Sequence, residues 1–192
     1  EHILTGELEP TNEGYALSKI ASTRLCEFVM RESTDKNYKT IIPCNIYGRH
    51  DEFDPKLSHL VPAVIRKLDE AVEGKSDSVN IWGDGESRRE FMCASEVADF
   101  VFWTIENFAL VPQNINLGLG YDYSITEYYK KIAEVVGFKG QFTFDLSKPS
   151  GMRRKLCDIS KLDSTGWKSK FSLEDGLKET YDFYLRNIKN GV

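Results

Sequence analysis

The chain has 192 residues, of which 41% are hydrophobic and 29% are charged, and its formal net charge is −5. This composition is typical of a globular protein with enough apolar residues for one sizeable core, or for one domain and part of another. The negative net charge argues against a nucleic-acid-binding protein, although it leaves room for a local basic pocket that binds a phosphorylated small molecule.

The cysteines and the apolar runs set further limits. The chain contains Cys26, Cys44, Cys93 and Cys157, which are widely spaced and form no C-x-x-C pair. A disulfide framework or a zinc site is therefore not expected, we predict no metal, and a reducing cytoplasm is the expected location. No apolar run approaches the length of a membrane span and no signal peptide is recognisable, so we expect no membrane partner.

In chain order, the hydrophobic pattern alternates between helices and strands. Residues 15–33 carry apolar side chains at a spacing near 3.6, which predicts a helix with Thr11 or Asn12 as its N-cap. The β-branched run at residues 38–48 predicts a buried strand that leads into a loop. A helix followed by a strand is half of a crossover unit in a parallel sheet, so this segment indicates an α/β fold.

The rest of the chain continues the alternation. Further strands are predicted at residues 78–85, 88–95, 113–120 and 140–147. Further helices are predicted at residues 59–74, 95–108, 124–137, 158–167 and 172–187, with Ser95 and Ser124 as N-caps of the second and third of these. The whole pattern therefore favours the α/β class.

Tyr15 and Lys19 lie four residues apart near the start of the first predicted helix. Positions i and i+4 share a helix face, so a phenol and an ammonium group can point into one site. A phenol is a poor proton donor at neutral pH because its pKa is about 10, and a nearby cation stabilises its ionised form. Such a pair suits reduction of a ketone, in which the phenol protonates the forming alkoxide. The same spacing also occurs often by chance on an ordinary helix face.

Five segments, in one order along the chain, resemble a known family. They are EPTNEGYALSKIASTRLCE at residues 9–27, PCNIYG at 43–48, SHLVPAVIRK at 58–67, IWGDGESRREF at 81–91 and SKPSGMRRKLCDISKLDSTGW at 147–167. Together they resemble the GDP-L-fucose synthases, which are bifunctional GDP-4-keto-6-deoxymannose epimerase/reductases of the extended short-chain dehydrogenase/reductase superfamily. The resemblance runs from about Glu7 to Tyr184. The Y-x-x-x-K spacing is typical of the whole superfamily, whereas SHLVPAVIRK and WGDGESRREF are typical of its nucleotide-sugar enzymes.

This resemblance implies the catalytic and cofactor residues. Tyr15 would be the acid/base, and Lys19 would hold the nicotinamide ribose and stabilise the phenolate. His59 would be the acid of epimerisation, since a His titrates in the range needed to return a proton, and a helix-capping His is the alternative. The residues implied to lie at the nicotinamide end of NADP(H) are Tyr15, Lys19, Pro43, Cys44, Asn45, Ile46 and His59. An ordinary buried loop is the alternative for Pro43 and Cys44, although ligands of open α/β sheets do bind beyond the carboxyl ends of strands.

The resemblance also implies the residues that bind a GDP-sugar. Lys67, Arg89 and Lys155 would occupy the basic positions that contact the pyrophosphate or the sugar, and Trp82 would offer an indole face to the guanine. The full implied set is Asn45, Leu60, Val64, Lys67, Ile81, Trp82, Arg89, Ser150 and Lys155. Lys67 stands where the family usually has Arg, and Ser150 where many members have Asp, so the exact nucleotide-sugar stays open. For Trp82 the alternative is a core residue at a strand end.

One part of such an enzyme is not found in the sequence. A glycine-rich G-x-x-G-x-x-G turn binds the dinucleotide pyrophosphate in this superfamily, and no segment of the chain has that spacing. The family's catalytic Ser and its epimerisation Cys also lie upstream of the Tyr. The chain moreover opens with Glu1 in a loop-like stretch. We therefore expect a fragment that lacks its N-terminal half.

The expected domain organisation follows from these observations. Residues 1–50 would be the end of a Rossmann-type NAD(P)-binding domain, and residues 51–192 a smaller α/β substrate-binding domain that returns in places to the Rossmann sheet. The expected function is NADPH-dependent epimerisation and reduction of a GDP-4-keto-6-deoxy sugar to GDP-L-fucose or a close relative, with the isolated chain inactive and a homodimer when full length. The alternatives are a reductase-only or epimerase-only enzyme on another nucleotide-4-keto sugar, such as a GDP-heptose, and a non-catalytic GDP-sugar-binding module.

Overall fold

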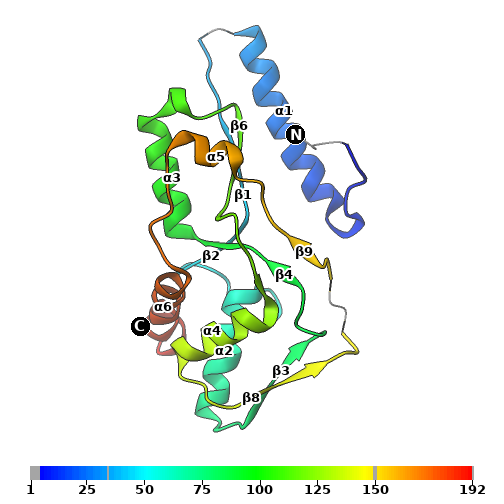
Figure 1. Ribbon diagram of the computed structural model, residues 1–192, viewed down its shortest axis with the longest axis vertical. Coiled ribbons are helices and arrows are strands. Elements are labelled where there is room, and N and C mark those ends of the chain that lie inside the picture. Colours follow the sequence, from blue (N-terminus) through cyan, green and yellow to red (C-terminus); the bar gives the residue numbers. More distant parts are fainter. Residues whose placement is uncertain (1–4, 34, 149–150, 192) are drawn as a thin grey trace.

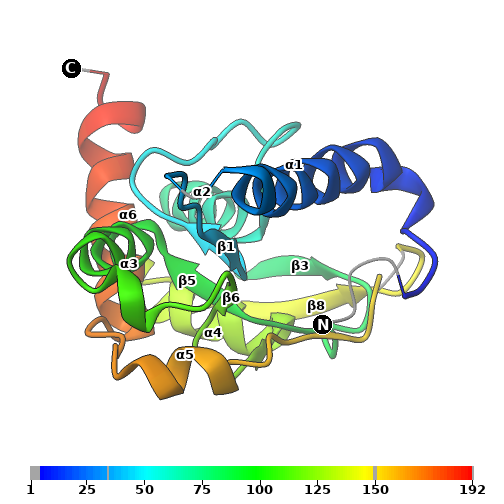
Figure 2. The same cartoon turned by 90° about the horizontal axis from the view of Figure 1, so that it is seen from above.

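The computed structural model of the chain describes residues 5–33, 35–148 and 151–191. One region is built on two parallel strands, β1 (Thr40–Pro43) and β6 (Asn114–Leu117). Helix α1 (Glu13–Glu32) lies on one side of this pair, whereas α5 (Ser160–Thr165) lies on the other side (Figure 2). Parallel strands covered by helices are the arrangement expected of an α/β fold, so the predicted class is confirmed.

A second region is built on another parallel pair, β3 (Ser78–Trp82) and β8 (Gln141–Asp145). Helices α2 (Leu60–Glu73) and α4 (Ile125–Val136) pack against each other beside these strands (Figure 1). The apolar faces of the helices and strands meet in one core cluster, in which Ile65, Ile81 and Ile132 are fully buried. The exclusion of these side chains from water stabilises the second region.

Short strands join the two regions. β2 (Asn45–Tyr47) runs parallel to β5 (Phe91–Cys93), and β4 (Arg88–Arg89) lies between β7 (Tyr123–Ser124) and β9 (Arg154–Lys155). The remaining elements are α3 (Ala94–Glu106), α6 (Leu173–Phe183), the 3-10 turns Pro10–Asn12 and Phe108–Leu110, and a π-helical turn at Tyr184–Lys189. The predicted domain boundary at residue 50 stays a prediction, and β6, α3 and α5, all C-terminal to it, belong to the first region.

Helix caps show which local predictions the structure supports. Ser124 accepts a hydrogen bond from the N–H of Glu127 in a capping box at the start of α4, so this predicted cap is confirmed. Asn12 occupies the N-cap position of α1 but makes no side-chain capping bond. The prediction for Ser95 is wrong, because α3 begins one residue earlier and the Ser95 hydroxyl donates to the Glu179 carboxylate instead.

Two findings concern the predicted absence of membrane spans and disulfides. Within the described residues, no helix is both long and apolar enough to cross a membrane. All four cysteines are free thiols, of which Cys44 and Cys93 are buried.

Candidate functional site

A cavity of about 1030 Å³ lies between α1, the consecutive strands β1 and β2, the start of α2 and the strands β4 and β9. We call it the site cavity. Ten residues that the sequence assigns to the site line it: Tyr15, Lys19, Pro43, Cys44, Asn45, Ile46, His59, Leu60, Arg89 and Lys155. The structure thus brings together side chains that are up to 140 positions apart, from Tyr15 to Lys155.

The charge of this lining is one-sided. Lys19, Lys39, Arg89 and Lys155 contribute cations, and the described lining contains no Asp or Glu side chain. The whole chain, by contrast, has a formal net charge of −5. Fixed cations in a hollow attract anionic ligands, so the local charge of the site cavity is opposite to that of the molecule as a whole.

Helix α1 supplies Tyr15 and Lys19 to the wall of the site cavity. The Lys19 ammonium lies 5.4 Å from the centroid of the Tyr15 ring, as the i, i+4 spacing predicts. Tyr15 is 68% exposed, so its phenol is accessible to a ligand. Ser22, Thr23 and Cys26 also line the cavity, although they were not among the predicted site residues. They lie three, four and seven residues after Lys19, and this helical spacing could have identified them as part of the same helix face.

Cys44, between β1 and β2, and Asn45, at the start of β2, are held in place by neighbouring segments of the chain. The N–H of Cys44 donates to the carbonyl of Leu117 at 2.8 Å, and Asn45 Nδ2 donates to the carbonyl of Glu90 at 2.7 Å. Burial, with smaller effects of Glu90 and Cys157, raises the pKa of the Cys44 thiol to about 12. Cys44 therefore forms a neutral part of the cavity wall at physiological pH.

His59 occupies the N-cap position of α2, and its imidazole makes no capping hydrogen bond. The side chain is exposed and lines the site cavity. The alternative of a helix-capping His has no support in this geometry. An exposed imidazole beside Tyr15 and Lys19 is available to donate or accept a proton of a bound ligand.

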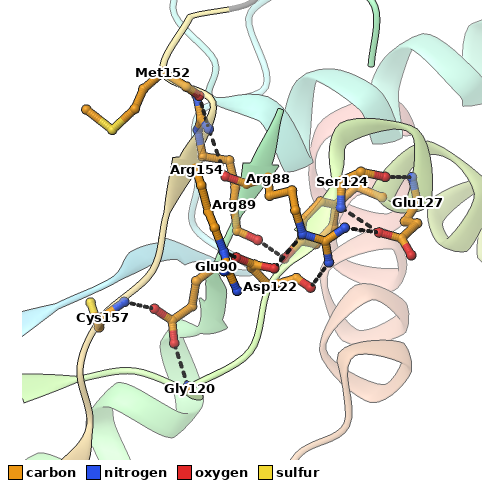
Figure 3. Close-up of polar contacts among 11 residues, drawn as sticks. Arg88, Arg89, Glu90, Gly120, Asp122, Ser124, Glu127, Met152, Arg154 and Cys157 are labelled. Atoms are coloured by element: carbon orange, nitrogen blue, oxygen red, sulfur yellow. Dashed lines mark hydrogen bonds and ion pairs between the residues drawn. The ribbon is translucent and has the colours of Figure 1, made fainter. Parts of the chain in front are cut away.

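Arg89 and Lys155 are register partners on the parallel strands β4 and β9. Arg89 Nη1 donates to the carbonyls of Arg88 at 2.8 Å and Met152 at 2.6 Å (Figure 3). Carbonyl oxygens orient the guanidinium without neutralising it, and none of the ion pairs within the described ranges involves Arg89. Its positive charge is therefore available to the site cavity.

The neighbouring arginines have a different role. Buried Asp122 pairs with Arg88 at 2.7 Å and with Arg154 at 2.5 Å (Figure 3). Burial opposes ionisation of this carboxyl, but hydrogen bonds from Arg154 and Arg88 hold its pKa below the usual range. Asp122 thus stabilises the three-stranded sheet and leaves Arg89 unpaired.

Four of the sequence-assigned substrate residues lie away from the site cavity. Val64 and Ile81 are 2% and 0% exposed in the core cluster beneath α2, so their side chains are not accessible to a ligand. Lys67 donates to the carbonyl of Asn80, and burial lowers its pKa. Trp82 is 67% exposed at the end of β3, so the alternative of a core residue does not apply to it.

Two predicted substrate residues, Trp82 and Ser150, keep their roles as predictions. The Lys148 ammonium lies 5.5 Å from the centroid of the exposed Trp82 ring, and Trp82 is the register partner of Asp145 in β8. A role in guanine binding stays a prediction for Trp82. Ser150 lies outside the described residues.

The residues present fit one end of a nicotinamide dinucleotide. In the part of the chain that the structure describes, no ion pair occupies the Lys19 ammonium, so it is available to donate to ribose hydroxyls beside Tyr15. The sequence contains no glycine-rich turn for the pyrophosphate end. Among the described residues there is no group of three or more His, Cys, Asp or Glu side chains that would hold a metal ion.

The chain is similar to known proteins over most of its length. The model of the NAD dependent epimerase/dehydratase family matches residues 1–118. The chain is 57% identical over 188 residues to the GDP-L-colitose synthase of Yersinia pseudotuberculosis, covering 98% of this chain and 61% of that protein. It is 47% identical over 183 residues to the GDP-L-fucose synthase of Azorhizobium caulinodans, covering 95% and 58% respectively. The chain therefore spans about three fifths of the length of these relatives.

Solved structures give the same result for the fold. The GDP-mannoheptose C4 reductase from Campylobacter jejuni, with NADP bound, superposes with a TM-score of 0.81 at 32% identity and covers 95% of this chain and 62% of that one. A GDP-L-fucose synthetase from Naegleria fowleri superposes with a TM-score of 0.86 over 97% of this chain and 58% of that one, and at 23% identity this likeness concerns the fold alone.

Proposed function

Because this chain belongs to the NAD dependent epimerase/dehydratase family, we propose that its site cavity binds a GDP-4-keto-6-deoxy sugar and that the whole protein converts this sugar with NADPH. The product would be GDP-L-fucose or a close relative. The 57% identity to a GDP-L-colitose synthase favours GDP-L-colitose as a second candidate product. The site residues carried over from the resemblance remain part of this proposal.

The observation that carries the proposal is the composition of the site cavity. Its wall combines four cations, an exposed phenol and an exposed imidazole, with no carboxylate in the described lining. A nucleoside diphosphate sugar needs cations for its pyrophosphate and proton donors beside its keto group. Arg89 and Lys155 line the cavity from β4 and β9, whereas Tyr15 and Lys19 line it from α1. The cavity therefore offers both kinds of group on separate walls.

The proposed chemistry assigns one proton transfer to Tyr15 and one to His59. When bound, NADPH would be held by Lys19 beside Tyr15 and would be the source of the hydride for the keto carbon. Tyr15 donates its phenolic proton to the oxygen of that carbonyl, and the Lys19 ammonium stabilises the phenolate that remains. His59 would return a proton to a carbon beside the carbonyl during epimerisation, after the epimerisation Cys that the resemblance implies upstream of Tyr15 has taken the original proton from the opposite face.

The alternatives differ in how much of this chemistry takes place. A reductase that acts on a GDP-heptose would use Tyr15 and Lys19 without epimerisation, and the printed title of a solved relative at 32% identity names such a reductase. An epimerase-only enzyme would require His59 and an upstream base. A non-catalytic GDP-sugar-binding module would require only the cations of the site cavity. The free cysteines support the further proposal of a reducing compartment such as the cytoplasm.

The proposed homodimer of the full-length protein is supported by the surface of α1. Only Thr23 of this helix is buried, and Leu17, Leu25 and Phe28 are exposed. A face with these side chains would gain stability by packing against other helices.

Calorimetric titration of the chain with GDP and with NADPH tests the proposal. We expect GDP to bind, because its anionic groups meet the cations of the site cavity. Binding of GDP without NADPH would support a binding module or a fragment, and binding of both would support the complete nucleotide-sugar reductase site. A chain that is folded by circular dichroism and binds neither ligand would contradict the proposal.

A further inference from the structure

Glu90 is a buried carboxylate between β4 and β5, and it is only 1% exposed. Its Oε1 accepts hydrogen bonds from the N–H groups of Leu119 and Gly120, the latter at 2.8 Å, and its Oε2 accepts from the N–H of Cys157 at 2.9 Å (Figure 3). No Lys or Arg within the described ranges pairs with it. Three backbone donors thus satisfy this anion.

The loop after β6 is shaped around this carboxylate. A Cβ atom added to Gly118 would lie 2.6 Å from Glu90 Oε1, closer than real Cβ contacts allow. Gly118 is itself buried. Glycine at this position therefore gives the carboxylate room to reach the N–H groups of Leu119 and Gly120.

Glu90 connects chain segments that carry cavity residues. It follows Arg89 directly, its carbonyl accepts from Asn45 Nδ2 at 2.7 Å, and its carboxylate holds Cys157, two residues after Lys155. Arg89, Asn45 and Lys155 all line the site cavity. One buried residue thus joins the three segments that form the cationic side of this cavity.

The segment around Lys155 depends on such polar anchors. Residues 151–156 are all exposed, so burial of apolar side chains contributes little to their placement. The segment is held by the N–H of Arg88 bound to the carbonyl of Arg153 at 2.8 Å, by the pair between Arg154 and Asp122, and by the bond from Cys157 to Glu90. Loss of the last anchor would loosen the C-terminal side of β9, where the next polar contact is the hydrogen bond from Asn116 Nδ2 to the carbonyl of Asp158 at 3.0 Å.

The charge of Glu90 also acts on the cysteines beneath the cavity. Burial and then this carboxylate raise the pKa of Cys157 to about 11, and both also raise the pKa of Cys44. The two thiols therefore stay neutral at physiological pH. Of the two, only Cys44 is among the described residues that line the site cavity, and its neutral thiol does not repel an anionic ligand.

We propose that Glu90 is a positioning residue for the cationic wall, the part of the site cavity formed by Arg89 on β4 and Lys155 on β9. Its buried carboxylate fixes these two residues relative to Asn45 and thereby sets the affinity of the site cavity for a nucleoside diphosphate. This inference rests on the proposed function. It assigns to Glu90 no contact with the ligand.

The test is a calorimetric GDP titration of the chain and its Glu90→Gln variant. A Gln amide offers one acceptor oxygen, so Glu90→Gln places an NH₂ group against one of the three backbone donors and removes that anchor. We expect GDP to bind about tenfold more weakly to the variant, because the loss of one charge-assisted hydrogen bond disturbs the geometry of the cationic wall. Glu90→Asp keeps both oxygens on a shorter side chain, and it should recover part of the lost affinity.

Glu96→Gln is the matched control. Glu96 is 2% exposed and also accepts backbone N–H bonds, from Lys170 at 3.0 Å and Phe171 at 3.1 Å, but it does not line the site cavity. Denaturant unfolding measures how much stability each Gln variant loses. If Glu90 only stabilised the fold, the two Gln variants would bind GDP with the same affinity when their losses of unfolding free energy are the same.

The outcomes separate this inference from the proposed function. If the wild-type chain binds GDP and Glu90→Gln binds it with the same affinity, the positioning role is wrong but the proposed function is not. The same holds if Glu96→Gln loses as much GDP affinity as Glu90→Gln. Absence of GDP binding to the folded wild-type chain overturns the proposed function and this inference together. If Glu90→Gln does not fold, wild-type affinity in a folded Glu90→Asp variant contradicts the positioning role and a weaker affinity supports it.

Discussion

Helices α1 and α2 both contribute to the site cavity, but they differ in how the rest of the chain holds them. Six residues of α2 are buried: Val61, Pro62, Val64, Ile65, Leu68 and Asp69. In the 20 residues of α1, only Thr23 is buried, and Tyr15 and Leu25 are more than 60% exposed. Tertiary packing supplies most of the stability of helices in proteins. The difference indicates that Tyr15 and Lys19 lie on a weakly packed element, whereas His59 and Leu60, at the start of α2, belong to the well-packed part of the chain.

The anchoring of α2 extends to the end of the chain. Buried Asp69 accepts a hydrogen bond from the Tyr181 hydroxyl at 2.8 Å and pairs with Lys189 at 2.6 Å. Lys189 also pairs with Glu73 at 2.9 Å. These contacts join the C-terminal half of α2 to α6 and its π-helical continuation, whereas α1 is tied to β6 by a hydrogen bond from Asn114 Nδ2 to the Glu27 carboxylate at 2.8 Å.

The largest expected effect concerns chemistry on α1. In the whole protein, Tyr15→Phe should lower the rate of ketone reduction by roughly 10²–10⁴-fold, because it removes the proton donor. Binding of GDP to the variant should change little, since the cations of the site cavity are retained. NADPH oxidation followed by absorbance measures the first effect and calorimetry the second. Turnover at the wild-type rate would refute the proton-donor assignment.

The next effect tests the packing difference directly. Ile65→Ala, at a fully buried position of α2, should reduce the free energy of unfolding by about 2–5 kcal/mol. Leu25→Ala, at a 62% exposed position of α1, should change it by less than about 0.5 kcal/mol. Denaturant titrations followed by tryptophan fluorescence give both values. Equal losses would show that α1 is packed as firmly as α2.

The smallest effect is a pH dependence at Cys44, beneath the cavity. Its folded pKa of about 12 exceeds the ordinary value of 9.0, mainly because of burial. The folded state therefore holds this proton more tightly, and the resulting stability is complete below about pH 9 and is lost as the pH rises toward 12. We expect the unfolding free energy of wild type to fall more steeply between pH 9 and 11 than that of Cys44→Ala. Parallel slopes would contradict the assigned shift.

One part of the candidate site followed from the residues themselves, because the i, i+4 spacing of Tyr15 and Lys19 predicts a shared helix face. The family resemblance implied Asn45, His59, Arg89 and the other site residues, and ten of the residues assigned in these two ways line the site cavity. Sequence resemblance assigned Val64 and Ile81 to a ligand wall, but a periodic pattern does not distinguish a residue that faces a ligand from one that faces the core.

Glu90 shows why the remainder was not predictable. Its carboxylate contacts backbone N–H groups that are 29, 30 and 67 residues away in the sequence. Backbone donors leave no mark in the sequence, and a Glu beside two arginines is typical of an exposed ion pair. The α/β class, by contrast, followed from the alternation of helix and strand patterns, which depends on local periodicity alone.

The central claim is that the cationic wall of the site cavity, with Arg89 and Lys155, binds GDP, and that Tyr15 on α1 does not contribute to GDP binding. The most direct measurement is a calorimetric titration of GDP into the wild-type chain, Arg89→Ala and Tyr15→Phe. We predict that Arg89→Ala weakens binding by roughly tenfold or more, because it removes a charge-assisted contact to phosphate, and that Tyr15→Phe leaves the Kd nearly unchanged. Unchanged affinity in Arg89→Ala, or an equal loss in both variants, would contradict the account.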